Sequence, residues 1–412
     1  MGSKLRRRPV PSLIIAALAG QAVIAAGVLA VLAVLNGPGL SRPAAPRPAV
    51  PAPAVAPGSG EAVPAYYAAL ARVPATGLRA AGITIRNTRS GKVVAAVQPP
   101  APYATFSMVA AASTASSWIV AASRQSARYQ AVPAASRVLG AGPTRLYLLA
   151  FDPVTRTTRI AALPGPAMPA LAIWGAALSP DGSRLAVAVV PSERVHQIRV
   201  YALARAAAVG GLPSGGTLQG TWSADTRMPS LFAFGDQPLG PQALSWAADD
   251  RTLAFNWQGP GLQDPGLSLG GLRLLDTRGT GGALLAGSRL AVRVPAPGFT
   301  CLGALVMTSN GQTVFCNGVK NGSTPDGHPV SAIAQFSAVT GKQARLLAPV
   351  QDKHAAIPPY ACIQWASPDG SVIVAGRWQS DGRTSQLAAI SAIGPGYTRP
   401  IPPAPDAGQV AW

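Results

Sequence analysis

The side chains best suited to chemistry in this chain are aspartates that recur at three of four matching places, with an asparagine at the fourth. These places hold Asp181, Asp249 or Asp250, Asn310 and Asp369. Paired carboxylates can serve as general acid and base, but an asparagine cannot replace one in that role. Because aspartate and asparagine interchange here, we expect these residues to shape turns rather than to catalyse a reaction.

The three histidines are isolated from one another and from any acid cluster. His196 precedes a strand-like run, and His328 and His354 stand in loop-like segments, so each is expected on the surface or in a loop. The oxygen-rich stretch 317–327 lacks the carboxylate spacing of a calcium loop. The chain has no Gly-x-Ser-x-Gly elbow, no P-loop and no GxGxxG motif. We therefore predict no catalytic residue, no metal ligand and no cofactor.

Three cysteines could form one disulfide. Cys301 precedes the hairpin "VMTSNGQTVFC" and Cys316 ends it, so the two are expected at the same end of one strand pair. No CxxC motif is present and no histidine stands at metal-ligand spacing, which disfavours zinc. Cys301–Cys316 is the expected disulfide. Pairing of Cys301 with Cys362 is one alternative, and three buried free thiols are the other.

Residues 177–189, "ALSPDGSRLAVAV", show the element that carries the acids. Pro180 presets φ, Asp181 suits the third turn position, and Gly182 tolerates the left-handed conformation that closes a hairpin. The apolar residues that follow alternate with others at strand spacing. The stretch therefore predicts a β-hairpin. It recurs at 245–257, 306–318 and 365–376, and in degraded form at 109–123.

Each hairpin is followed by a second strand–turn–strand motif, as in "RLYLLAFDPVTRTTRIAAL". The two motifs together predict a four-stranded antiparallel unit that repeats as a β-propeller blade does. Five units leave strand-like ends at 64–70, 82–97 and 408–412. Joining these ends would build a sixth blade and remove an open strand edge. The sequence predicts an all-β propeller with six blades, and seven blades are the alternative.

The N-terminus predicts a membrane anchor. Residues 1–11 hold four basic residues and no acid, and residues 12–35 carry no charge. Such a run is long enough to span a bilayer, and the basic flank is expected to stay cytoplasmic. We expect a transmembrane helix at 12–35, a Pro/Ala-rich linker at 36–64 and a propeller domain at 65–412 outside the cell. A long cleaved signal peptide and a buried core helix are the alternatives.

The net charge of +19 does not indicate a nucleic-acid partner. The basic residues are mostly single arginines spread along the chain, without a basic run or an aromatic-interleaved patch. They are expected to be scattered, solvated side chains.

The Ser-Pro-Asp-Gly hairpins at 179–182 and 367–370 resemble the blade signature of WD40-like, TolB-type propellers. The order of basic N-terminus, apolar span, Pro/Ala linker and repeats is similar to membrane-anchored WD40-like proteins of high-GC Gram-positive bacteria. The resemblance covers about residues 66–412 and the anchor, although the Gly-His and Trp-Asp marks of true WD40 repeats are missing. It implies the fold and the topology, and it says little about activity.

These observations favour a protein that is not an enzyme. We expect a membrane-anchored module outside the cell that binds or scaffolds an unidentified protein or cell-envelope ligand. The expected recognition loop is the long connection 221–243, with Trp222, Phe232 and Phe234. The alternative is an extracytoplasmic propeller enzyme, a hydrolase or lyase acting on a cell-wall or glycan substrate.

Overall fold

The described residues of the computed structural model lie within Gly58–Trp412. The described residues are 63–71, 82–112, 116–124, 144–165, 172–192, 195–204, 215–225, 240–258, 271–293, 299–320, 330–350, 360–378, 384–393, 398–402, 404 and 407–412. The segments predicted as cytoplasmic N-terminus (1–11) and transmembrane helix (12–35) lie outside them. Among the described residues no helix could cross a bilayer.

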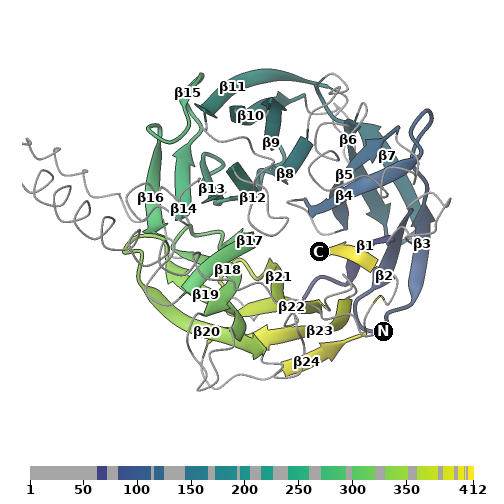
Figure 1. Cartoon of the computed structure of the whole chain (residues 1–412). Helices are drawn as coiled ribbons and strands as arrows, with labels where there is room; N and C mark the ends of the chain where they lie inside the picture. The colour runs from purple at the N-terminus through teal and green to yellow at the C-terminus, as the bar shows by residue number, and fades with distance from the viewer. Residues whose placement is uncertain are drawn as a thin grey trace, which may run out of the picture. The chain divides into compact units, whose positions relative to one another are not determined.

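The described strands form six antiparallel blades around a central channel (Figure 1). Blade 1 has the order β25-β1-β2-β3, blade 2 runs from β4 to β7, and blade 3 from β8 to β11. Blade 4 is β12-β13-β14-β16, blade 5 runs from β17 to β20, and blade 6 from β21 to β24. The prediction of an all-β propeller with six blades is confirmed, and the seven-blade alternative is wrong.

Each blade has an inner strand at the channel and three further strands toward the outside. The inner strands are β25 (Ala407–Ala411), β4 (Thr105–Ala111), β8 (Ala172–Leu178), β12 (Gly240–Trp246), β17 (Phe299–Met307) and β21 (Tyr360–Ala366). The second strands are β1 (Tyr66–Ala71), β5 (Ser117–Ser123), β9 (Arg184–Ser192), β13 (Thr252–Gln258), β18 (Thr313–Lys320) and β22 (Val372–Trp378). The third strands are β2 (Ile83–Asn87), β6 (Thr144–Asp152), β10 (Val195–Leu203), β14 (Gly271–Asp276), β19 (Val330–Ser337) and β23 (Thr384–Ser391). The outer strands are β3 (Val93–Val97), β7 (Thr157–Ala162), β11 (Gly216–Asp225), β16 (Ser288–Arg293), β20 (Gln343–Val350) and β24 (Thr398–Ile401).

The hydrophobic core consists of six clusters, each between two neighbouring blades. Strand alternation explains this division, because successive side chains point to opposite faces of a blade. In β13, Phe255 and Trp257 pack toward blade 3, whereas Ala254 packs toward blade 5. Both faces of a blade are therefore covered, and the ring has no free sheet face.

The C-terminal strand closes the ring as the sequence predicts. β25 pairs antiparallel with β1, with Val410 opposite Ala69. Trp412 is buried beyond the end of β25, where its ring stacks on Tyr67 at a centroid distance of 4.7 Å. The indole Nε1–H of Trp412 donates to the Thr88 hydroxyl at 3.2 Å.

Blades 3 and 4 share one additional strand. The short strand β15 (Gly281–Ala283) lies in the chain between β14 and β16, but it pairs in parallel with β11 of blade 3. The sequence motif of blade 4 predicts only a strand, a turn and a strand. The structure adds this backbone bridge between blades.

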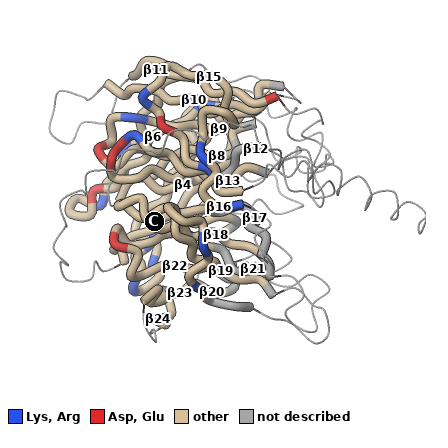
Figure 2. Tube along the Cα trace, turned by 90° about the vertical axis from the view of Figure 1, so that its left-hand side faces the viewer, with Lys and Arg blue, Asp and Glu red and all other residues tan. Residues whose placement is uncertain are grey.

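The two ends of the channel differ in their connections. Turns between first and second strands, such as 179–184 and 367–372, lie at the same end as turns between third and fourth strands, such as 88–92 and 338–342. We call this end the turn face. In Figure 2 most acidic residues, drawn red, lie with the C-terminus on the left-hand side, which is the turn face.

Candidate ligand-binding channel

The central channel holds a cavity with a volume of about 650 Å³. All six inner strands contribute to its wall, so the ring closure described above is what creates it. Its polar side chains include Ser107, Ser245, Gln364 and Gln409, and most of the remaining wall is apolar.

The described wall of this channel contains no acid, no base and no histidine. It can offer hydrogen bonds and apolar contact, which suit an uncharged ligand. Binding a charged group there would remove its hydration without supplying an opposite charge.

Each inner strand departs from regular pairing at a β-bulge. The register shifts occur at Phe106/Met108, Ile173/Gly175, Gln242/Leu244, Cys301/Leu305, Ile363/Trp365 and, opposite β25, Leu70/Ala71. A bulge inserts a residue without a partner and redirects its side chain. Ser107, Ala243 and Gln364 are such residues, and all three line the channel.

Two backbone N–H groups on the channel side of the inner strands bond to a neighbouring blade. The Val109 amide donates to Gln409 Oε1 at 3.1 Å, and the Met307 amide donates to the Ser245 hydroxyl at 2.9 Å. Each inner strand pairs with one neighbour only, so its second edge faces the channel. An extended ligand could bond to such an edge as an added strand does.

Four turns at the mouth of the channel share one hydrogen-bond pattern. In each, an aspartate or asparagine Oδ1 accepts the amide two residues later, at 2.9 to 3.0 Å. The accepting residues are Asp181, Asp249, Asn310 and Asp369. The prediction that these residues shape turns is confirmed by their contacts.

The fourth turn residue explains the variation among the repeats. It has a positive φ in every copy: 70° at Gly182, 67° at Gly311, 73° at Gly370 and 52° at Asp250. Aspartate is one of the few other residues that adopt this left-handed conformation. Asp249 therefore takes the place of Asp181, and Asp250 takes the place of the glycine.

Hydrogen bonds link the turns of successive blades. The Asp181 amide donates to Asp250 Oδ1 at 2.9 Å, and the Ala248 amide donates to the Ser309 carbonyl at 2.6 Å. The Ser309 amide and hydroxyl both donate to the Pro368 carbonyl, at 3.1 and 2.8 Å. Blades 3 to 6 are thus joined around this mouth.

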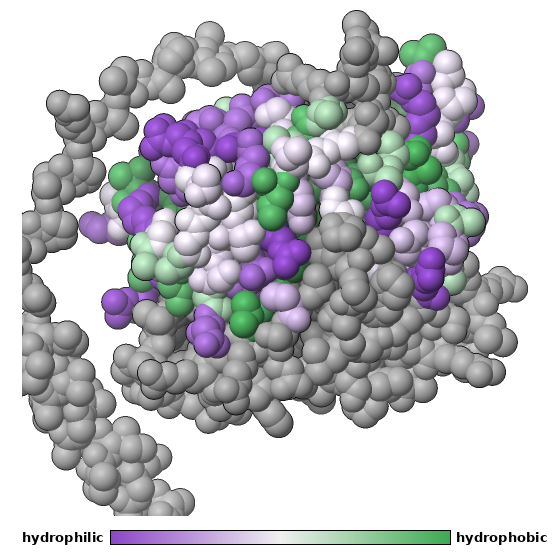
Figure 3. Space-filling model, turned by 90° about the horizontal axis from the view of Figure 1, so that it is seen from above, coloured by the Kyte–Doolittle hydropathy of each residue, from purple (hydrophilic) through white to green (hydrophobic). Residues whose placement is uncertain are grey.

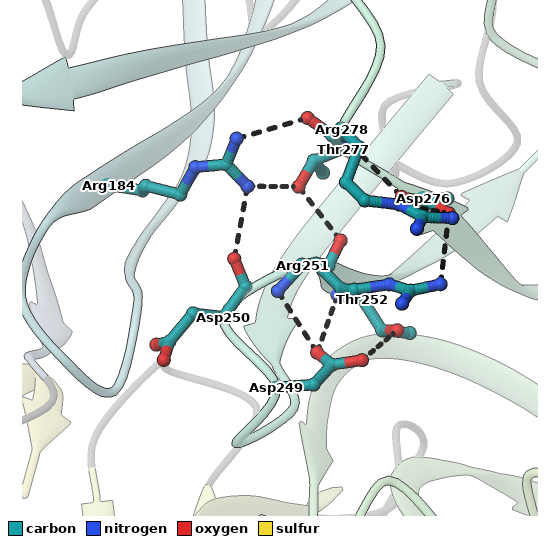
Figure 4. A network of polar contacts seen from close by, with 8 residues as sticks. All are labelled: Arg184, Asp249, Asp250, Arg251, Thr252, Asp276, Thr277 and Arg278. Atoms are coloured by element: carbon teal, nitrogen blue, oxygen red, sulfur yellow. Dashed lines mark hydrogen bonds and ion pairs between the residues drawn. The ribbon is translucent and has the colours of Figure 1, made fainter. Parts of the chain in front are cut away.

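Arg184 extends this network between blades 3 and 4 (Figure 4). Its guanidinium donates to the Asp250 carbonyl at 3.0 Å, and to the Thr277 hydroxyl and carbonyl at 2.8 and 3.3 Å. Arg289 and Arg345 likewise donate to carbonyl groups of the next blade, at 3.1 and 2.8 Å. Some of the scattered arginines therefore hold neighbouring blades together.

The carboxylates of the turns are already engaged by these contacts. Burial opposes the shift, but hydrogen bonds from Ser179 and Ser183 lower the pKa of Asp181 to about 2. Burial and then the neighbouring negative charge of Asp181 raise the pKa of Asp250. In Asp369, a hydrogen bond from the Ser367 hydroxyl is the main reason for a lowered pKa. This pattern fits structural turns.

Two positions expected at the surface are buried. Trp222 lies in β11, is 3% exposed and packs between blades 3 and 4, so its assignment to a recognition loop is wrong. The alternation of Trp222 and Ala224 with the polar residues beside them, as in Ser223, is the strand signal that could have shown this. Phe232 and Phe234 lie outside the described residues.

His196 is also a correction, because it is fully buried in β10. Its ring meets Trp257 edge to face at 5.8 Å. Burial lowers the pKa of His196 to about 4. His328 and His354 lie outside the described residues. Within the described part of the chain, no group of three His, Cys, Asp or Glu residues could hold a metal ion.

Cys316 takes part in a disulfide. The cluster that contains Cys316 lies between blades 4 and 5, whereas Cys362 begins blade 6. In the β17–β18 register, Cys301 is the partner of Gly318, two residues beyond Cys316. We propose Cys301–Cys316 as the pair on this register.

Solved structures that are similar to this chain have low sequence identity to it. TolB from Acinetobacter baumannii is 14% identical with a TM-score of 0.46, and the match covers 84% of this chain and 65% of TolB. The periplasmic gluconolactonase PpgL of Pseudomonas aeruginosa is 14% identical with a TM-score of 0.44, and the match covers 81% of each chain. A Bacteroides uniformis protein proposed to be a 6-phosphogluconolactonase is 15% identical with a TM-score of 0.43, covering 82% of this chain and 83% of that one. This chain thus spans about two thirds of the length of TolB. No family model and no curated protein matches.

One expectation about function is corrected by these comparisons. The sequence favoured a protein that is not an enzyme, but two of the similar structures are titled as a periplasmic gluconolactonase and as a proposed 6-phosphogluconolactonase. At 14 to 15% identity, these likenesses assign no activity to this chain. The fold alone therefore does not support the exclusion of an enzyme.

Proposed function

We propose that this chain is a membrane-anchored propeller outside the cytoplasm that binds an uncharged, extended segment of a cell-envelope protein in its central channel. The observation that carries the proposal is the channel itself. It is about 650 Å³ in volume, open strand edges face it, and its described wall has no charged side chain.

A peptide segment matches this wall better than a small charged metabolite. Its backbone can pair with inner-strand edges, and its neutral side chains can contact the apolar wall. The bulged residues Ser107 and Gln364 add polar groups for orientation. A charged ligand would find no opposite charge in the described wall.

The anchor is the second part of the proposal and is supported by the sequence. Residues 12–35 are uncharged and follow a basic N-terminus, and residues 36–62 are rich in Pro and Ala. A Pro-rich spacer is semi-rigid and extends about 3 Å per residue. It would hold the propeller outside the cell while keeping it tethered.

Photo-crosslinking in intact cells tests the channel. A photoreactive amino acid at Gln364 should form an adduct with an envelope protein, because this residue lines the channel. The same probe at the exposed Arg159, on the outer strand β7, should form none. An adduct at Arg159 alone, or no adduct at Gln364 in chains correctly placed in the membrane, would contradict the proposal.

Cysteine labelling tests the topology. Ser59→Cys in the linker should react with an impermeant maleimide on intact cells, and Ser3→Cys should react only after lysis. The unsubstituted chain supplies the background of the native cysteines. Protection of position 59 until lysis would contradict the proposed orientation.

A further inference from the structure

The exposed large hydrophobic side chains of the described chain all lie toward the turn face. They are Val93, Val154, Leu218, Val339 and Ile393. Each stands in, or within three residues of, a connection between the third and fourth strands of a blade. Val154, Val339 and Ile393 occupy the connections themselves and are 89%, 60% and 62% exposed. The five side chains stand singly on five blades, so they could contact a partner only at separate points around the ring.

The same connections carry exposed basic side chains. Arg89, Lys92, Arg156 and Lys342 are all exposed there, and Arg278 is paired with Asp276 at 2.6 Å. Besides Asp276, these connections contain the acid Asp152. Its carboxylate accepts hydrogen bonds from the backbone amides of Val154 and Thr155, at 2.9 and 3.3 Å. The other acids of this face belong to the turns around the channel mouth. Basic charge and apolar groups are therefore combined at the outer rim.

Figure 3 shows the described ring from its edge. In Figure 3 hydrophobic side chains, drawn green, stand among hydrophilic ones, drawn purple, on the described part of the ring. Separate apolar contacts among cations suit the headgroup region of a membrane, where aliphatic groups enter the lipid and cations meet phosphate.

The described N-terminal end lies at the same face. The Thr88 hydroxyl and amide donate to the carbonyls of Pro64 and Ala65, at 2.7 and 2.8 Å. These contacts fix the start of β1 next to the 88–92 connection. The described chain therefore begins at the turn face.

We propose that the outer rim of the turn face, formed by the third-to-fourth-strand connections with Val154, Val339, Ile393, Arg156 and Lys342, docks on an anionic lipid surface. This inference rests on the proposed membrane anchor. Residues 36–62 reach at most ~80 Å, so this tether would keep the propeller close to the lipid surface. Because the local lipid concentration is then high, even a low affinity of the rim for lipid is enough for docking. The opposite end of the ring then points away from the membrane.

The experiment uses the full chain in vesicles that contain lipids with headgroup nitroxides. An environment-sensitive fluorescent amino acid at Thr340, beside Val339, reports the turn face, and the same probe at Gln98 reports the opposite end. In vesicles with about one third anionic lipid, the Thr340 probe should be quenched and the Gln98 probe should not. Quenching at Thr340 should fall in zwitterionic vesicles and at high salt.

Charge reversal gives a matched pair of variants. Each basic residue near an anionic surface favours docking about fivefold, so R156E/K342E should lower the ratio of docked to undocked chain at least about 25-fold. R124E/R293E makes the same change at the opposite end of the ring and should have no effect.

Three outcomes would overturn the docking inference. The first is equal quenching of the Thr340 and Gln98 probes, and the second is quenching at Thr340 that does not depend on the charge of the lipid. The third is a change in the environment of the Thr340 probe only when an envelope protein is added. The last outcome would assign the rim to a protein partner instead. Failure of the proposed membrane anchor gives a different result, because the chain would then be lost from the vesicles after an alkaline wash.

Discussion

Replacement of Trp412 by alanine tests whether the last residues hold the propeller closed. The Trp412 side chain is 4% exposed, stacks on Tyr67 at 4.7 Å and donates to the Thr88 hydroxyl at 3.2 Å. Its neighbours come from both ends of the described propeller, including Val63 and Val410. Its removal leaves a cavity where the first and last segments meet.

The magnitude follows from the burial. A buried tryptophan replaced by alanine costs about 3–5 kcal/mol. A domain of about 350 residues has an unfolding entropy near 0.7 kcal/mol/K, so Tm should fall by about 4–7 °C. Thermal unfolding of the full chain in detergent, followed by circular dichroism, measures this shift.

Trp412→Phe is the matched control. Phenylalanine keeps an aromatic ring over Tyr67 but cannot donate to Thr88, so it should cost only about 1 kcal/mol, or about 1–2 °C. If Trp412→Ala melted within about 1 °C of the parent chain, the reasoning about closure would be refuted.

Further predictions concern a buried histidine, a contact between blades and a disulfide. Burial holds the pKa of His196 near 4 in the folded chain, whereas its ordinary pKa is about 6.5. Between pH 6.5 and pH 4, therefore, only the unfolded state binds a proton at this histidine. Stability should therefore fall by up to about 3 kcal/mol from pH 6.5 to 4, and His196→Gln should lack this part of the pH profile in denaturant titrations. Arg184→Met should cost about 1.5–3 kcal/mol in the same assay, because it removes the bonds to Thr277; a loss under 0.5 kcal/mol would count against the contact. Peptide mapping without reduction should recover Cys301 linked to Cys316, with Cys362 free to react with an alkylating reagent. A disulfide that includes Cys362 would exclude our pairing.

The architecture could be predicted because its signals are local. Turn residues such as Asp181 and Asn310 make hydrogen bonds within six residues, so the sequence shows them directly. Regular spacing of these turns indicated blades, and strand-like ends indicated closure. The position of β25 beside β1 confirms that argument.

The channel could not be predicted in the same way, because its wall depends on distant pairing. Ser107 and Gln364 face the channel owing to bulges, and a bulge is defined only against the partner strand. Similarly, β10 begins before the apolar run that marks it in the sequence, which buries His196. The partner strand β11 decides this extension, with Ala224 opposite His196.

The central claim is that a segment of an envelope protein occupies the channel, and a blocked channel tests it most directly. Ser107→Trp should fill space at the exposed Ser107 position, whereas Ser107→Ala leaves the channel open. The measurement is the Kd for the protein crosslinked at Gln364, with both variants checked for an unchanged Tm. The account predicts that Ser107→Trp raises Kd at least about 100-fold, or about 2.7 kcal/mol, while Ser107→Ala changes it less than about threefold. Equal Kd values for the two variants would contradict binding in the channel.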